Sequence, residues 1–332
     1  MKFKVETYKD NIVFITVENE NKLKAVFSNY GAGMYSLKYD ELPLILEIED
    51  KEVWLNHPNY YGKTLGRVCG RIPCNGEING VKYRLDETMA NYCLHGGTTD
   101  SLSFKSWTYE IKEFKSKINV IFMISSKNKE NGFPGNAKIK VIYEIYKNNN
   151  NLKCIYKAST SNSTLVNLSN HNYYNFFNSK DVSDYSLKVA SSKYGVIDQT
   201  TFIIGTERVP WYLDFARAAK LDNRLTYLEN KTWIKTIDNT FLFDEVNPKK
   251  PQVVFKSPEF KLTLYTSYPT LNIFCDNFHY LTKFTQFKEM DSGRRSLALE
   301  PQLYDFDLKS LRLNKGQKYN HFWLLKLKDL RK

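Results

Sequence analysis

Short segments in which every second residue is apolar recur along the chain and predict β-strands. Residues 139–145 read Ile-Lys-Val-Ile-Tyr-Glu-Ile, and residues 152–158 read Leu-Lys-Cys-Ile-Tyr-Lys-Ala. Because successive strand side chains point to opposite faces of a sheet, this period of two gives each segment one apolar face. The asparagine run Asn148–Asn151 lies between them, and asparagine tolerates the left-handed backbone of a tight turn. The two segments are therefore predicted to pair as a hairpin.

The rest of the pattern extends this prediction to the whole chain. Strands are expected over residues 23–27, 120–124 and 260–265, and Asn75-Gly76 and Asn79-Gly80 are turn signals. Helical periodicity is weak, and the best candidate, near residues 214–225, is short. Many short strands with little helix predict an all-β protein with a β-sandwich fold. No linker rich in proline, glycine or serine and no internal repeat appears, so residues 1–332 are expected to form one domain.

Composition indicates a folded protein and narrows the range of partners. Of the 332 residues, 42% are hydrophobic and 15% are aromatic, which argues against disorder. The formal net charge of +12 could signal nucleic acid or an anionic substrate. However, the lysines are scattered singly, and no zinc-finger, recognition-helix or aromatic RNA-binding motif accompanies them. We therefore expect no nucleic-acid partner and interpret the charge as a general surface property.

The N-terminal segment and the cysteines suggest a cytoplasmic location. The first residues lack the uninterrupted apolar core of a signal peptide, and no apolar run approaches the length that spans a bilayer. No membrane partner is therefore expected. The five cysteines are odd in number, form no CxxC pair and lie in no nucleophile signature, so reduced thiols are the simplest interpretation. They are Cys69, Cys74, Cys93, Cys154 and Cys275.

One carboxylate and two histidines stand out by their local sequence. Glu300 ends an apolar run and precedes a proline, which biases its backbone toward an extended conformation. His95 is followed by two glycines, which let the backbone approach a ligand closely. His171 lies among asparagines and tyrosines, a combination of polar groups and rings that suits a sugar. A carboxylate and an imidazole can take and give a proton at neutral pH. An ordinary turn histidine at 95 and a core histidine at 171 fit the residues equally well.

Three further charged residues are candidates for binding or structure. Arg67 and Arg71 are four positions apart and would share a face if both lay on one strand. Arg71 could donate to hydroxyls or to a developing oxyanion, whereas Arg67 is expected to form structural salt bridges. Asp238 could accept hydrogen bonds from adjacent hydroxyls or cap a turn. The remaining histidines have no comparable surroundings and are interpreted as structural: His57, His279 and His321.

Taken in order, these segments resemble the aldose 1-epimerase family, also called galactose mutarotases, over nearly the whole chain. Each segment is modest alone, and their order and spacing carry the resemblance. The resemblance implies a large twisted antiparallel β-sandwich with the site in an open cleft. The segments are Phe27–Ala32, Tyr61–Ile72, Leu94–Gly97, Gly132–Gly135, Val166–Asn175, Val209–Pro210, Asp214–Phe215, Asp238–Phe241, Leu299–Gln302 and Leu313–His321.

The resemblance also implies a reaction and a role for each residue. By position, His171 matches the general acid of the family and Glu300 its general base. His95 and Arg71 match residues that hydrogen-bond the sugar near its reacting end, and Asp238 matches the carboxylate that holds hydroxyls elsewhere on the ring. The implied activity is that of an isomerase, which interconverts the α and β anomers of free aldohexoses such as galactose and glucose. The sugar is the expected partner, and neither a cofactor nor a metal is required.

Several positions depart from the family pattern. Asn272 falls where the family often has a glutamine that touches the sugar, so we also expect Asn272 to bind substrate. Gly70 stands where many members have an asparagine, and Asn239 replaces a frequent histidine. Residues 303–306 replace a loop that bears Pro-Asp. These departures leave the acid and the base in place but leave the preferred sugar open.

Other functions remain open from the residues alone. Asp238 and Glu300 could be the paired carboxylates of a glycoside hydrolase. An enzyme acting on hexose 6-phosphates would require basic side chains around C6 of the sugar, and a non-catalytic sugar-binding or regulatory protein would not need an acid–base pair. Either a monomer or a homodimer fits the sequence.

Overall fold

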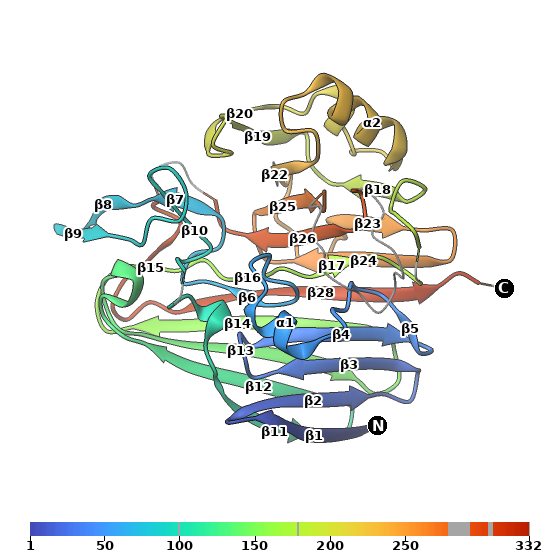
Figure 1. Ribbon diagram of the computed structural model, residues 1–332, viewed down its shortest axis with the longest axis horizontal. Helices are drawn as coiled ribbons and strands as arrows, with labels where there is room; N and C mark the ends of the chain where they lie inside the picture. Colours follow the sequence, from blue (N-terminus) through green and yellow to red (C-terminus); the bar gives the residue numbers. More distant parts are fainter. Residues whose placement is uncertain (99, 178, 278–292, 305–307, 332) are drawn as a thin grey trace.

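The computed structural model describes residues 1–98, 100–177, 179–277, 293–304 and 308–331. In these residues three antiparallel sheets build the body of the molecule, and helices are few and short (Figure 1). The predicted all-β fold, a large twisted antiparallel β-sandwich, is confirmed. No helix of the described residues is both long and apolar enough to cross a membrane.

A nine-stranded sheet runs through the whole molecule. Its middle is occupied by the strand that comes last in the chain, β28, which pairs with β14 on one side and β24 on the other. In spatial order the strands are β11 (Thr108–Glu113), β12 (Lys117–Ser126), β13 (Ala137–Tyr146), β14 (Asn151–Thr160), β28 (Tyr319–Asp329), β24 (Phe260–Thr266), β23 (Val253–Lys256), β18 (Ser186–Val189) and β21 (Ala219–Lys220).

Two further sheets are the five-stranded and six-stranded ones. The five-stranded sheet contains β1 (Lys2–Lys9), β2 (Ile12–Glu18), β3 (Leu23–Ser28), β4 (Gly33–Tyr39) and β5 (Leu42–Pro43). The six-stranded sheet contains, in spatial order, β17 (Tyr173–Tyr174), β26 (Leu297–Gln302), β25 (Thr270–Cys275), β22 (Asp238–Leu242), β19 (Lys193–Ile197) and β20 (Ile203–Arg208).

Short pairs and helices connect these sheets. The two-stranded pairs are β6 (Thr64–Leu65) with β16 (Ser169–Asn170), β7 (Arg71–Pro73) with β10 (Tyr92–Leu94), β8 (Asn75–Ile78) with β9 (Val81–Arg84), and β15 (Thr164–Leu165) with β27 (Arg312–Leu313). The helices are α1 (Lys51–Asn56) and α2 (Asp222–Lys231), with short 3₁₀ turns at Leu102–Phe104, Glu130–Gly132 and Trp211–Leu213.

Both smaller sheets pack on the same face of the nine-stranded sheet. Toward β11–β14, Phe27 of the five-stranded sheet stacks on Tyr143 of β13, with ring centroids 4.4 Å apart. Toward β18–β28, Leu271 and Ile273 of β25 join the same apolar cluster as Phe255 and Leu262. One face of the long sheet is therefore buried by two partners, and the alternation read from the sequence is the pattern that such one-sided burial requires.

The predicted hairpin and strands are confirmed. Residues 139–145 and 152–158 lie in β13 and β14, which pair with Ile145 opposite Leu152. The other predicted strands lie in β3, β12 and β24. Asn79-Gly80 is the turn between β8 and β9, and both residues have positive φ, as such a turn requires.

Two local predictions are wrong. Asn75-Gly76 is not a turn, because these residues begin β8 and pair with β9. The helix expected near residues 214–225 lies later, at Asp222–Lys231. At the earlier position the side chain of Asp214 accepts a hydrogen bond from the N–H of Ala216 (3.0 Å), and this local bond competes with helix formation.

Candidate active site

The six-stranded sheet turns one face to the core and the other to a cavity of about 180 Å³. On β26, Leu297 and Leu299 pack in the core, so the alternate residues Glu300 and Gln302 line the cavity. The sequence Leu-Ala-Leu-Glu-Pro-Gln is therefore what positions a carboxylate at the cavity floor, on a strand held on both sides by β17 and β25.

Neighbouring strands add polar groups to the same floor. Thr240 of β22 lies opposite Asn272 of β25, which in turn lies opposite Glu300. The Asn272 amide accepts a hydrogen bond from the Thr240 hydroxyl (3.0 Å) and donates one to Asp238 (3.3 Å). Asn272 thus lines the cavity and its amide orients Asp238, while the expected contact of Asn272 with a sugar stays a prediction.

His171 lies in the segment between β16 and β17, and its ring contacts the carboxylate of Glu300. Its backbone N–H donates to the carbonyl of Lys63 (3.0 Å), and its carbonyl accepts from Gly62 (2.9 Å), which fixes the backbone. The ring stacks on Tyr173, with centroids 4.7 Å apart. Nε2 then lies 3.5 Å from Oε1 of Glu300. The two residues that the sequence singled out are therefore brought into direct contact.

His95 lies beside this pair, at the end of β10. Its ring packs edge-on against that of His171, with centroids 5.5 Å apart. The N–H of Gly70 donates to Nδ1 of His95 (3.2 Å), so the proton of the neutral ring is on Nε2. The following Gly96 has φ +85°, and a Cβ there would lie 2.2 Å from the carbonyl oxygen of Gly66. The glycine therefore allows the close approach that seats His95.

The two arginines have separate positions. Arg71 lies at the start of β7 and contacts Asp238, with 3.2 Å between Nη2 and Oδ2. Arg67 lies before that strand and is 2% exposed, so the idea that both arginines share a strand face is wrong. Arg67 is structural, but it donates to the carbonyls of Pro134 (3.0 Å) and Gly135 (2.9 Å) instead of forming the expected salt bridge.

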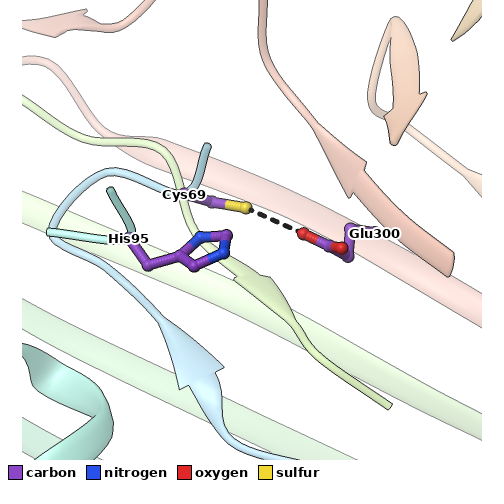
Figure 2. Close-up of side chains that lie close together, drawn as sticks. All are labelled: Cys69, His95 and Glu300. Carbon is purple, nitrogen blue, oxygen red and sulfur yellow. Dashed lines mark hydrogen bonds between the residues drawn. The ribbon is translucent and has the colours of Figure 1, made fainter. Parts of the chain in front are cut away.

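Cys69 is a cavity residue that the sequence did not single out. Its thiol donates to Oε2 of Glu300 across 3.6 Å, and His95 completes a compact group (Figure 2). Cysteine, histidine and glutamate so placed could hold a metal ion. Burial and the Glu300 charge raise the pKa of the thiol, and the N–H of Gly70 on Nδ1 leaves the proton of the neutral His95 ring on Nε2. The Cys69 thiol is thus a hydrogen-bond donor to Glu300, and the His95 ring lies close to both.

Burial shifts the pKa values of the acid–base pair in opposite directions. It raises the pKa of Glu300 to about 8, an effect that the charge of Asp238 reinforces and the Cys69 thiol opposes. It lowers the pKa of His171 to about 3. Because groups in contact titrate as a unit, the pair holds one proton between these pH values. A pair that holds one transferable proton suits general acid–base chemistry.

Other cavity-lining residues come from segments without a distinctive sequence signal. Tyr60 packs against the His95 ring, and Phe202 comes from the turn between β19 and β20. Cys69 lies two positions before Arg71, and Gln302 lies two positions after Glu300. Because alternate residues of a strand share a face, the position of Glu300 could have indicated Gln302. Nothing in the sequence pattern indicates that Tyr60 and Phe202 meet the same cavity.

The remaining sequence candidates lie away from the cavity or outside the described residues. His57 accepts from the N–H of Asn59 (3.2 Å), and His321 lies beside the hydroxyl of Ser267 (3.3 Å); neither lines the cavity. Asn239 is on the core face of β22, opposite in direction to Asp238, so it does not replace a sugar contact. His279, Asp305 and Phe306 lie outside the described residues.

Comparisons with known proteins show the family to which the chain belongs. The family model of aldose 1-epimerase matches residues 14–326. The aldose 1-epimerase of Haemophilus influenzae is 27% identical over 304 residues, which cover 87% of this chain and 85% of that protein. The galactose mutarotase of Rattus norvegicus is 26% identical over 292 residues, covering 84% of this chain and 82% of that protein.

A solved structure agrees in fold. The galactose 1-epimerase of Lactobacillus acidophilus superposes with a TM-score of 0.87 at 21% identity, covering 99% of this chain and 98% of that one. The sheets described above therefore have a galactose mutarotase-like fold. With the family match over most of its length, this chain belongs to the aldose 1-epimerase family.

Proposed function

We propose that this protein is an aldose 1-epimerase that interconverts the α and β anomers of free aldohexoses such as galactose and glucose. The observation that carries the proposal is the contact between Nε2 of His171 and Oε1 of Glu300, 3.5 Å, at the floor of a cavity. The cavity also presents the Arg71–Asp238 pair, which can bind sugar hydroxyls. Ring opening moves protons at two neighbouring oxygens, the anomeric hydroxyl and the ring oxygen, and a nearby acid and base suit these transfers.

The single proton of the pair is sufficient for the reaction. Burial favours a protonated Glu300 and a neutral His171. Moving that proton to Nε2 gives the carboxylate and the imidazolium that ring opening uses. Glu300 then takes the proton of the anomeric hydroxyl while His171 donates to the ring oxygen, and the bond between C1 and the ring oxygen breaks.

Ring closure reverses these transfers. In the open-chain state Glu300 is protonated and His171 is neutral, which is the distribution that burial favours. Rotation about the C1–C2 bond presents the other face of the aldehyde to the C5 hydroxyl. Reversal of both proton transfers then closes the ring as the other anomer. Each positioned proton donor or acceptor contributes about 10²- to 10⁴-fold.

The charges that line the cavity favour an unphosphorylated sugar. Among the described lining residues, Arg71 is the cationic side chain, and its charge is balanced by Asp238. A hexose 6-phosphate carries a dianion that such a lining does not neutralise. The contact between Arg71 and Asp238 also argues against a glycoside hydrolase with Asp238 and Glu300 as its paired carboxylates, because Asp238 is held by Arg71 and Asn272.

Polarimetry, or NMR of the anomers, tests the proposal directly. Starting from pure α-D-galactose or α-D-glucose, the purified protein should accelerate the approach to anomeric equilibrium. Glu300→Gln and His171→Asn should each slow the catalysed rate by about 10²-fold or more, because each removes one proton-transfer group. His321→Asn is the matched control and should retain the rate, because His321 lies on β28 away from the cavity.

The alternatives give different results in the same set of assays. No acceleration with any free aldose would refute the proposal, and release of phenol from aryl glycosides would indicate a hydrolase instead. Full activity of Glu300→Gln would show that this carboxylate is not the base. Sugar binding without acceleration would indicate a binding protein.

A further inference from the structure

Gln302 presents a free amide to the cavity. It lies on the cavity face of β26, is 6% exposed, and its backbone carbonyl accepts from the hydroxyl of Thr270 (2.8 Å). Its side-chain oxygen and nitrogen make no hydrogen bond to any described residue, whereas Asn272 on the neighbouring strand is engaged on both sides. A buried amide ordinarily has hydrogen-bond partners, so this one is available to a ligand.

The backbone at position 70 keeps that amide accessible. Gly70 has φ +83°, and a Cβ added there would lie 3.1 Å from Oε1 of Gln302. A side chain at this position would therefore press against the amide and cover it. Glycine leaves the space in front of the Gln302 amide open to the cavity.

The position of Gln302 relative to Glu300 indicates which part of a sugar it meets. The two residues are two positions apart on one strand face, so their Cα atoms are separated by about 6.8 Å along β26. Asp238 lies in a different direction, across β25 on β22. In the proposed function Glu300 contacts the anomeric hydroxyl and Asp238 binds hydroxyls farther along the sugar. Gln302 then lies beside the reducing end of the sugar, away from the line between Glu300 and Asp238.

We propose that Gln302 is a specificity-determining residue whose amide binds the hydroxyl on C2 of the aldose. This inference rests on the proposed function, which places C1 at Glu300 and the ring oxygen at His171. The remaining neighbour of C1 is C2. A carboxamide can both donate to and accept from one hydroxyl, and a site that binds a hydroxyl discriminates against a sugar that lacks it.

Gln302→Met tests the assignment because methionine keeps the length of the side chain and removes its polar atoms. With galactose, kcat/KM should fall about tenfold, mainly through KM, since the lost hydrogen bond is made before and during the reaction. With 2-deoxygalactose, the same substitution should change kcat/KM by less than about twofold. In Gln302→Asn the amide is on a shorter side chain. Its kcat/KM with galactose should therefore lie between the values of the unmodified protein and of Gln302→Met.

Two controls separate a sugar contact from a structural role. The urea midpoint of Gln302→Met should equal that of the unmodified protein, because the amide makes no hydrogen bond to any residue that the structure describes. Equal losses of kcat/KM with galactose and 2-deoxygalactose, or no loss with galactose, would overturn the inference while leaving the proposed function intact.

A protein that accelerates no aldose would refute the proposed function, and the inference would then be decided by binding. Calorimetric titration with galactose and 2-deoxygalactose should show a selective loss of galactose affinity in Gln302→Met. An unchanged galactose affinity would overturn the inference.

Discussion

The protonation of Glu300 depends on a balance between its immediate neighbours. Burial and the charge of Asp238 raise its pKa, whereas the hydrogen bond from the Cys69 thiol lowers it. The thiol itself stays protonated, because burial and Glu300 raise its own pKa. Cys69 is therefore a neutral hydrogen-bond donor that stabilises the carboxylate.

Replacing Cys69 by alanine should move the alkaline limb of the pH profile to higher pH. Activity is expected to fall as pH rises through about 8, where the pair loses its proton. Without the thiol donor the ionised carboxylate is less stable, so the pKa of Glu300 rises. The alkaline limb of the pH profile therefore moves to higher pH. The plateau rate should change by less than about tenfold. The pH dependence of kcat/KM measures this shift, and a limb that moves downward would contradict it.

The control for this experiment is Cys74→Ala. Cys74 is also buried, but it lies in a separate apolar cluster and does not line the cavity. Its replacement should leave the alkaline limb unchanged.

Lys63 is a second residue whose charge is opposed by burial. Its ammonium is buried and contacts the carbonyl of Leu55 and the ring of Phe104, 4.3 Å from the centroid. Burial lowers its pKa to about 7. The folded protein therefore releases this proton above about pH 7, whereas the unfolded chain keeps it until its ordinary pKa of 10.5.

Lys63→Met should remove part of the pH dependence of stability. Between pH 7 and 10 the unfolded state binds more protons than the folded state, so this residue makes stability rise with pH, by at most about 1.4 kcal/mol per pH unit. The variant should be more stable than the unmodified protein at pH 7, and its advantage should shrink as pH rises. Urea unfolding at pH 7, 8 and 9 measures the difference, with exposed Lys249→Met as the unaffected control.

At the scale of elements, the sequence predicted the strands better than the site. Alternation identified β13, β14 and β24, because each buries one face against the core. The same alternation puts Glu300 on the cavity side of β26. The position of His171 depends instead on backbone hydrogen bonds to Gly62 and Lys63, far away in the sequence, which no local pattern reveals. The resemblance to the family supplied what periodicity could not.

The turn between β19 and β20 shows how an irregular element shapes the cavity. Asp198 holds the turn by accepting from the N–H groups of Thr200 (2.8 Å) and Phe202 (3.1 Å). Phe202 then stacks on Tyr92 of β10, with centroids 4.2 Å apart and an interplanar angle of 10°. This stacked pair joins the β19–β20 turn to β10.

Phe202→Ala should loosen that wall and weaken sugar binding. Loss of the stacked pair should raise KM by about 2- to 10-fold with little change in kcat, because the ring has no group that transfers a proton. Steady-state rates across a range of galactose concentrations provide the measurement. Ile204→Ala is the matched control: it lies on the same hairpin, is 61% exposed and should leave KM unchanged. A larger effect on kcat than on KM would contradict this interpretation.

At the scale of the whole molecule, positive charge gathers on the uncovered face of the nine-stranded sheet. Lys256, Lys261 and Lys328 are opposite one another across β23, β24 and β28, and Lys140 is opposite Lys157. None of these five pairs with an acidic side chain among the described residues. Part of the excess charge seen in the sequence is thus a set of like-charged neighbours, which are destabilising when directly opposite.

Lys261→Glu should stabilise the protein because it replaces two repulsive pairs by attractive ones. We expect the free energy of unfolding to rise by about 0.5–1 kcal/mol at low salt, and the gain to shrink as salt screens the charges. Lys82→Glu is the opposing control, since Lys82 lies opposite Glu77 and its replacement creates a like-charged pair. Thermal unfolding at low and high salt checks both signs; a lower midpoint for Lys261→Glu would contradict the prediction.

The central place of β28 has a consequence for how the protein is made. Residues 319–329 are synthesised after all the other strands described above. These residues nevertheless form the pairings that join β14 to β24. Until they emerge, the nascent chain carries two long strands with unpaired edges, which can template association with other chains. The six-stranded sheet, which forms the cavity floor, packs on the part of the nine-stranded sheet that contains β23 and β24. The nine-stranded sheet can therefore be completed only after residues 319–329 have been made.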